Sequence, residues 1–289
     1  MTSIASPGDH RMAAGETPAT GTLVLGGTGK TGRRVAARLT AHGLPVRIGS
    51  RSGTPPFDWD DPATWASAVA GTGSVYLVCS PDLSVPAAAP AVRSLTQLAV
   101  HAGVRRLVLL SQRGENLVHP SERAVQEAGA EWTILRASWF NQNFSEGHLT
   151  EPVRRGAVAL PAGSVAEPFI DADDIADVAA AVLTEDGHAD QVYDLTGPRL
   201  LTFADAAAEI SSAAGREVRY QPLSPDAYAS ALAEAGIPAE YVRLVTGLTT
   251  RGLDGRNAYV TNDVQRVLGR APTDFTDYAR ATAATGVWA

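Results

Sequence analysis

The sequence predicts an α/β protein with a Rossmann-type doubly wound parallel sheet and a smaller C-terminal substrate-binding domain. Short apolar runs alternate with amphipathic helical patterns through the first half of the 289-residue chain. Repeats of this βα kind build parallel sheets with helices on both faces. A glycine-rich turn, "LVLGGTGKTG", joins the first apolar run to the first helical pattern. After about Ser145 the alternation becomes looser, as in a cap that covers the carboxyl ends of the strands.

In the first half of the chain, apolar runs predict the strands, and capping residues predict where the helices begin and end. Gly43 and Gly103 end two of the helical patterns, and Asp61 followed by Pro62 begins a third. A further short strand is expected to end at the segment "FDWDD". The expected main strands are 21–27, 45–50, 74–80, 105–111 and 131–138, and the expected helices are 31–43, 61–71, 89–103 and 121–129.

The second half is expected to be mainly the substrate-binding cap. Thr202 is a plausible N-cap for the helix that follows it. The expected elements are a hairpin-like segment 156–163, a strand 191–196 that returns to the sheet, and helices 171–186, 202–215, 224–238, 239–252 and 273–288. The domains are therefore expected to be a disordered leader 1–20, a Rossmann domain 21–147 and the cap 148–289.

Composition narrows the function classes. The formal net charge is −7 with no basic run, which argues against a nucleic-acid partner, and no window approaches a membrane span. Cys79 is the only cysteine, which excludes an intrachain disulfide. The acids of "DADDIAD" suit helix capping, the histidines are scattered, and no metal site is expected. Residues 1–20 lack the apolar core of a signal peptide, so a cytoplasmic location is expected. The oligomeric state stays open between a monomer and a homodimer.

The glycine turn has two interpretations, because its "GKT" also ends a nucleoside-triphosphate P-loop. A P-loop needs glycine at the position of Val24, which lies inside the expected strand. In the dinucleotide interpretation, Gly26 makes a tight turn, Gly29 lets the backbone approach a pyrophosphate, and Gly32 lets the helix pack on the strand. The helix N-terminus then faces the phosphates. The spacing favours a dinucleotide.

The end of the second expected strand indicates which dinucleotide binds. An NAD site needs an acid there for the ribose hydroxyls, but the segment reads "RIGSRSG". Arg51 suits a 2′-phosphate, with Ser52 and Lys30 as further donors, and this favours NADP(H); the alternative is a solvated loop charge. Asp58, in the segment Asp58 to Asp61, is a candidate to flank the adenine, whereas Asp61 is better explained as the helix cap. The cofactor-binding candidates are Gly26, Thr28, Gly29, Lys30, Thr31, Gly32, Arg51, Ser52 and Asp58.

Six segments together resemble the NmrA-like atypical short-chain dehydrogenases: "GGTGKTG", "GSRSG", "FDWDDPATW", "VYLVCSP", "EWTILRASWFNQNFSE" and "PFIDADDIADVA". Within that family the chain most resembles the festuclavine/agroclavine dehydrogenase-like group of ergot alkaloid biosynthesis. The resemblance runs from about Thr22 to the closing "FTDYARATAATGVW". It implies NADP(H) at the glycine turn.

The resemblance also implies a nicotinamide site and a range of activities. The nicotinamide would lie between the loop Cys79, Ser80 and Pro81 and the loop that begins at Ala137. Members of the family include imine, iminium, quinone, azo and carbonyl reductases, and regulators that bind the cofactor without turnover. Ala137 replaces a proline that many relatives have, and the usual Tyr-x-x-x-Lys is absent.

The proton donor is the open question of this chemistry. Lys30 is the only lysine and has no tyrosine four residues before it, so a Tyr/Lys relay is excluded. His119 and Arg123 have the spacing of that relay, and His119 is a candidate donor; the alternative is a surface histidine at a helix N-terminus. Ser111, at a strand end, is a candidate to hydrogen-bond the substrate or the nicotinamide ribose.

The absence of a Tyr/Lys relay favours substrates whose reduction needs no proton donor. Hydride addition to an iminium ion gives a neutral amine and needs no acid, whereas addition to a ketone makes an alkoxide that does. Imines and iminium ions therefore rank first, quinones and conjugated acceptors next, and simple ketones last. Trp139, Phe140 and Asn143 are expected to contact an aromatic or heterocyclic substrate; the alternative for the aromatic side chains is core packing.

The sequence thus predicts an NADPH-dependent oxidoreductase that transfers hydride to a small-molecule imine, iminium ion or conjugated carbonyl in secondary metabolism. The alternatives are a quinone or carbonyl reductase and a non-catalytic NADP(H)-sensing regulator. An intact nicotinamide pocket with an open cleft lined by Trp139 and Asn143 would favour the enzyme, whereas a plugged cleft or a partner surface in its place would favour the regulator.

Overall fold

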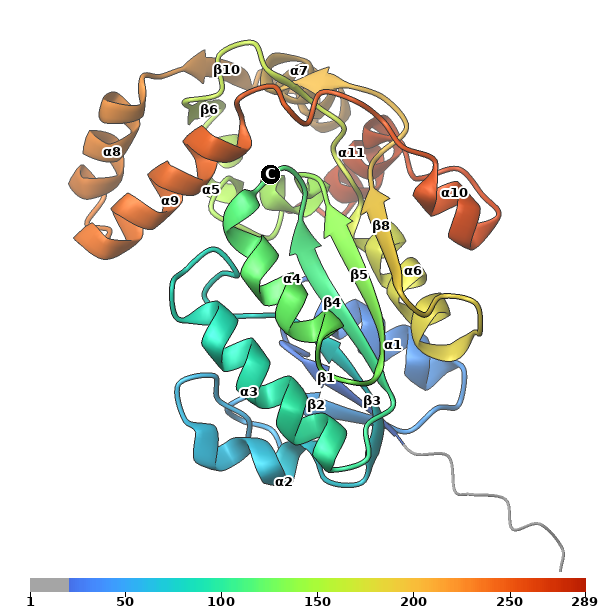
Figure 1. The fold of residues 1–289 in the computed structure, drawn as a ribbon. Helices are drawn as coiled ribbons and strands as arrows, with labels where there is room; N and C mark the ends of the chain where they lie inside the picture. Colours follow the sequence, from blue (N-terminus) through green and yellow to red (C-terminus); the bar gives the residue numbers. More distant parts are fainter. Residues whose placement is uncertain (1–20) are drawn as a thin grey trace, which may run out of the picture.

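The computed structural model describes residues 21–289, so the expected leader 1–20 lies outside the described residues. Its centre is a six-stranded sheet in which every neighbouring pair of strands is parallel (Figure 1). Across the sheet the order is β2 (Val46–Gly49), β1 (Gly21–Leu25), β3 (Thr72–Leu77), β4 (Arg106–Gln112), β5 (Glu131–Ala137) and β8 (Gln191–Leu195). The Rossmann-type fold class is confirmed.

Helices cover both faces of the sheet. Successive side chains of a strand point to opposite faces, so each strand contributes apolar side chains to a core on either side. Leu23 and Leu25 belong to one buried cluster and Val24 to another. The first cluster is completed by α2 (Trp65–Val69), α3 (Ala88–His101) and α4 (His119–Gln126), and the second by α1 (Gly32–Ala41) and α6 (Ala172–Thr184). The uninterrupted apolar runs of the sequence are explained by this burial on both faces.

The strand order creates the place where a ligand can bind. β1 lies between β2 and β3, so the connections that leave β1 and β2 run in opposite directions across the sheet. In open α/β sheets ligands bind outside the carboxyl ends of the strands at this reversal. The glycine turn after β1 and the loop after β3 border that crevice. β8, the segment expected to return to the sheet, pairs with β5 at the other edge.

The rest of the chain packs over the carboxyl ends of the strands (Figure 1). It has its own core, in which Phe144, Phe169, Phe203 and Phe275 contact one another. Its elements are α5 (Thr150–Arg154), β6 (Ala157–Leu160), β7 (Ala166–Glu167), β9 (Leu201–Thr202), α7 (Phe203–Ala214), β10 (Arg219–Pro222), α8 (Pro225–Glu234), α9 (Ala239–Gly252), α10 (Asp263–Leu268) and α11 (Phe275–Ala284). We call these elements the cap, except α10, which packs on α6 and β8.

Two local predictions are confirmed and two are wrong. The Asp61 carboxylate accepts a hydrogen bond from the Ala63 N–H at the start of a short 3-10 turn, and Thr202 forms a capping box with Asp205. The segment "FDWDD" adds no strand to the sheet and makes only an isolated bridge between Asp58 and Asp61. The reason is that the Asp58 N–H bonds the Thr64 hydroxyl and the Asp58 carbonyl accepts from the Trp65 indole.

The segment 156–163 is not a hairpin. Its strand β6 pairs in parallel with β10, about sixty residues further along the chain. A short apolar strand carries no local signal of a partner at that distance, whereas a hairpin is signalled by its turn. Within residues 21–289 no helix has the length and apolar character needed to cross a membrane.

Candidate active site

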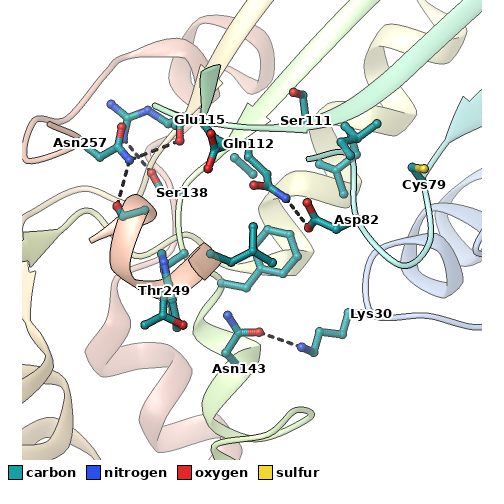
Figure 2. A pocket seen from close by; sticks show the side chains of 18 of the residues that line it. Lys30, Cys79, Asp82, Ser111, Gln112, Glu115, Ser138, Asn143, Thr249 and Asn257 are labelled. Atoms are coloured by element: carbon teal, nitrogen blue, oxygen red, sulfur yellow. Dashed lines mark hydrogen bonds between the residues drawn. The ribbon is translucent and has the colours of Figure 1, made fainter. Parts of the chain in front are cut away.

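A cavity of about 520 Å³ lies where the sheet's strand ends meet the cap (Figure 2). Its lining comes from several places in the fold. They include the glycine turn (Lys30), the loop after β3 (Cys79, Pro81, Asp82), the end of β4 and the residues after it (Ser111, Gln112, Arg113, Glu115), the end of β5 and the loop after it (Ala137, Ser138, Trp139, Phe140, Asn143), β7 (Glu167) and helix α9 (Val245, Leu248, Thr249, Gly252). Helix α9 therefore roofs a crevice that the sheet would leave open.

The glycine turn has the geometry that a dinucleotide phosphate needs. Gly26 has φ +62°, and its carbonyl accepts a hydrogen bond of 2.8 Å from the Gly29 N–H. A Cβ at Gly32 would overlap the Gly26 carbonyl, whereas a Cβ at Gly29 would have only that oxygen within 4 Å, at 3.2 Å. Gly32 therefore permits close packing, and Gly29 leaves backbone accessible at the N-terminus of α1.

Polar groups are available after β2. Arg51 and Ser52 are exposed, and the Arg51 guanidinium makes no hydrogen bond or ion pair with residues 21–289. The Ser52 hydroxyl lies 3.4 Å from the Ser50 hydroxyl. Asp58 is half-buried in its turn nearby in sequence. No acid follows β2 directly, so the segment is suited to an anionic group rather than to ribose hydroxyls.

Lys30 reaches toward the cap. Its Nζ donates a 2.7 Å hydrogen bond to Asn143 Oδ1, and both residues line the cavity (Figure 2). Burial lowers the pKa of Lys30, and the nearby Glu146 carboxylate opposes that effect. The one lysine of the chain thus joins the turn predicted to bind the cofactor to the loop predicted to bind the substrate.

The loop after β3 contributes two of its three predicted residues to the cavity wall. Cys79 and Pro81 line the cavity, and Ser80 is exposed outside the wall. Burial, with the nearby Asp82 carboxylate, raises the pKa of Cys79 to about 12. The thiol is therefore neutral at physiological pH and is a poor nucleophile. Ala137, predicted for the opposite side, also lines the cavity.

The two candidate catalytic residues, Ser111 and His119, lie in different surroundings. Ser111 lines the cavity, and its hydroxyl donates a 2.7 Å hydrogen bond to Glu122. Glu122 is also bound by Arg136; burial alone would raise the pKa of Glu122, but these hydrogen bonds lower it. His119 is the first residue of α4, is half-buried and is not part of the cavity wall. Of the two candidates, only Ser111 lies in the cavity wall.

The predicted substrate contacts lie together. Trp139, Phe140 and Asn143 all line the cavity. The Trp139 ring also packs edge-on against Phe203 of the cap core, with ring centroids 5.2 Å apart. Core packing and cavity lining were alternative interpretations of Trp139, and the same side chain does both.

Sequence reasoning missed Glu167, the most unusual side chain of the wall. This residue of β7 is 1% exposed, and neither carboxylate oxygen has a hydrogen-bond partner among residues 21–289. Burial raises the pKa of Glu167 to about 7, an effect that Arg113 partly offsets and Asp254 strengthens. The signal in the sequence was an acid inside the apolar run "VAEPFI", where an unpaired carboxylate is costly.

Arg113, also missed, is held in place at the end of β4. It is buried, donates a 2.8 Å hydrogen bond to the Ser138 hydroxyl, and its guanidinium lies 4.3 Å from the centroid of the Tyr259 ring. The side-chain amide of Asn257, labelled in Figure 2, donates a 3.3 Å hydrogen bond to the Arg113 carbonyl. These residues come from distant parts of the sequence, and no motif links them. Across residues 21–289, no three His, Cys, Asp or Glu side chains group as a metal site would require.

Known proteins resemble the chain over nearly its whole length. Uncharacterized oxidoreductase YesF of Bacillus subtilis is 33% identical over 279 residues, 92% of this chain and 97% of that protein. Festuclavine synthase II of Penicillium roqueforti is 31% identical over 89% of this chain and 96% of its own length. The NAD(P)H azoreductase of Xenophilus azovorans is 31% identical over 91% and 98%. No protein-family model matches the chain.

Solved structures share the fold. Triphenylmethane reductase of Citrobacter sp. in complex with NADP(H) superposes with a TM-score of 0.73 at 22% identity, covering 91% of this chain and 99% of that one. A double mutant of NmrA superposes with a TM-score of 0.71 at 16% identity, covering 93% and 97%. At these identities the superpositions establish the architecture.

Proposed function

Because the chain belongs to the NmrA-like atypical short-chain dehydrogenases, close to the festuclavine and agroclavine dehydrogenases, we propose that it is an NADPH-dependent reductase. Its substrate would be a small imine, iminium ion or conjugated carbonyl. The observation that carries the proposal is a glycine turn built for a dinucleotide, opening onto a cavity of about 520 Å³ at the reversal of the strand order. Several relatives carry the names of reductases or dehydrogenases that act on small molecules.

The residues present fit NADP(H). The space at Gly29 and the N-terminus of α1 would receive the pyrophosphate, and the exposed Arg51 would bind the 2′-phosphate. The cavity wall between Cys79 and Ala137 would hold the nicotinamide. When bound, the reduced nicotinamide supplies the hydride, and the protein supplies position and exclusion of water.

The apolar wall supports a flat organic substrate. Trp139 and Phe140 from the loop after β5 and Leu248 from helix α9 offer apolar surface to the cavity, and Asn143 offers an amide group to the same cavity. Such a wall would hold a planar acceptor against the nicotinamide through buried apolar contact area rather than through many hydrogen bonds. Helix α9 would close over the bound pair.

A substrate panel tests the proposal. Protein saturated with NADPH is mixed with cyclic imines, quinones and simple ketones, and nicotinamide absorbance is followed. We expect oxidation with imines and quinones and little with ketones. Tight NADPH binding, measured by fluorescence, without oxidation by any member of the panel would instead identify a cofactor-sensing regulator.

A further inference from the structure

Glu167 is held beside the loop predicted to bind the substrate. Its strand β7 pairs with β9, with Glu167 opposite Leu201. Three residues later, the Ile170 N–H donates to the Trp139 carbonyl and the Ile170 carbonyl accepts from the Asn141 N–H, both at 2.9 Å. These two hydrogen bonds attach the Glu167 segment to the loop after β5. The carboxyl group is thereby fixed in the wall of the cavity.

The carboxyl group serves no visible structural purpose. Both oxygens are buried and without a hydrogen-bond partner among residues 21–289, and the residue is 1% exposed. Arg113, whose charge acts on Glu167, donates a hydrogen bond to Ser138 and forms no ion pair with Glu167. Leaving a buried carboxyl unpaired costs stability, and such groups are retained at sites that use them.

We propose that Glu167 is the proton donor of this cavity and that it serves a basic nitrogen of the substrate, which selects cyclic imines within the reductase function proposed above. The inference rests on that function. It adds to the chain an acid that the absence of a Tyr/Lys relay had seemed to exclude.

The step balances with NADPH as the reductant. The new C–H bond takes its hydride from NADPH, and the π pair of the C=N bond forms an N–H bond with the proton of Glu167. The products are an amine, NADP⁺ and the Glu167 carboxylate, which regains a proton from water. Nitrogen is favoured over oxygen before the hydride arrives, because an imine nitrogen is basic enough to take the proton and to form an ion pair with the carboxylate. A carbonyl oxygen is far less basic and gives no such ion pair.

The protonation state of Glu167 at neutral pH suits this role. Burial raises the pKa of Glu167 to about 7, so a large fraction is protonated at physiological pH. Arg113 lowers the pKa and Asp254 raises it, and Asp254 is itself paired with Arg256. On β9, Leu201 opposite carries no charge. The other titratable side chains of the cavity wall are Lys30, Cys79, Asp82, Glu115 and His148.

The experiment uses a matched pair of substrates. An indolenine is a weakly basic, neutral imine, and its N-methylindoleninium salt carries a permanent charge and needs no proton. For the indolenine, we expect kcat/KM to fall about tenfold per pH unit above pH 7, as Glu167 loses its proton. For the salt, we expect tighter binding in the presence of NADP⁺ as pH rises through 7, measured by calorimetry, because the carboxylate pairs with the cation.

Glu167→Gln removes the acid with little change of shape. We expect kcat/KM for the indolenine to fall about 100-fold and both pH dependences to disappear. The salt and a quinone should lose less than about tenfold, and NADPH affinity should not change. The control is Glu115→Gln. Glu115 also lines the cavity but is paired with Arg251 at 3.0 Å, so this variant should keep the inflection near pH 7.

The outcomes separate the inference from the proposed function. Equal losses on all three substrates, or an unchanged indolenine profile, would make Glu167 structural and overturn the inference. Quinone reduction without reduction of either nitrogen compound would overturn it and leave the reductase standing. If nothing oxidises NADPH, the proposed function fails, and the calorimetric pH dependence alone then decides whether Glu167 binds a nitrogen cation.

Discussion

The two regions predicted to bind the cofactor phosphates and the substrate are built in opposite ways. The first, which we call the cofactor wall, is the single stretch Gly26 to Gly32, of which Lys30 reaches the cavity; its shape is set by contacts between its own backbone atoms. The second, which we call the substrate wall, is the part of the cavity predicted to face the substrate, and it gathers Arg113, Glu167 and Thr249 from just after β4, from β7 and from α9. A continuous segment leaves a motif in the sequence, whereas a gathered wall leaves none. The contrast suggests that the cofactor wall carries the chemistry common to many reductases and the substrate wall carries what is particular to this chain.

The largest expected effect is on the cofactor wall. In Gly32→Ala the new methyl group would overlap the Gly26 carbonyl, so the first turn of α1 must move away from β1. We expect a loss of about 3 kcal/mol or more in the free energy of unfolding, together with weaker NADPH binding. Urea unfolding and fluorescence titration measure the two losses.

Gly29→Ala is the companion variant that sharpens this contrast. Its methyl group would lie 3.2 Å from the same carbonyl, a contact that small shifts relieve. We expect nearly unchanged unfolding but weaker NADPH binding, because the methyl group occupies the approach to the phosphates. Identical behaviour of the two variants would show that the glycines do not divide packing from binding.

The next effect tests the substrate wall without any ligand. Glu167 is protonated more readily in the folded chain, where its pKa is about 7, than in the unfolded chain, where it is about 4.5. The folded state therefore binds the extra proton between these values, and wild type loses stability as pH rises from about 4.5 to 7. The difference corresponds to about 3 kcal/mol relative to Glu167→Gln. Parallel stability curves for the two proteins from pH 4 to 8 would contradict the burial of an unpaired carboxyl.

A smaller effect concerns the choice of cofactor. Arg51→Asp removes the exposed guanidinium after β2 and places an acid there. We expect NADPH to bind about 10- to 100-fold more weakly, because a charge-assisted hydrogen bond is worth about 1.5–3 kcal/mol, and NADH to bind about as before. Calorimetry with both dinucleotides decides the matter. Equal weakening of the two would show that Arg51 does not face the 2′-phosphate.

The smallest effect concerns the link between the two walls. Glu146 follows the loop after β5 and pairs with Arg33 and Arg34 of α1, at 2.5 and 2.8 Å. Because these ion pairs are partly exposed, Glu146→Gln should cost less than about 1 kcal/mol, and the cost should shrink as salt is added. Thermal unfolding at two salt concentrations measures it. A cost that does not depend on salt would indicate packing rather than charge.

Much of the sheet could be predicted because its strands are buried on both faces and read as apolar runs. The returning strand, β8, was also predicted, although it lies at the edge of the sheet and only Tyr193 and Leu195 of its five residues are buried. The pairing of β6 with β10 was not, since neither short strand carries a signal of its partner. The short strand expected to end at "FDWDD" does not join the sheet, because side chains of Thr64 and Trp65 take up the backbone groups of Asp58.

The residues of the candidate site likewise divide into those that the sequence could place and those that it could not. The glycine turn, Trp139 and Asn143 could be placed at the strand ends from the sequence, because parallel strands bring their carboxyl ends together. Glu167 could not, since a two-residue strand in the cap gives no indication of which cavity it faces. His119 had the right spacing from Arg123 for a relay, but spacing alone did not bring it to the cavity wall.

The bond between Lys30 and Asn143 has a practical consequence. Since the chain has no other lysine, an amine-directed reagent can mark only this side chain and the α-amino group. The ammonium group lies in the cavity wall, between the turn and the loop. Protection from acylation, followed by mass spectrometry of one peptide, would thus report occupancy of the cavity without any engineered label.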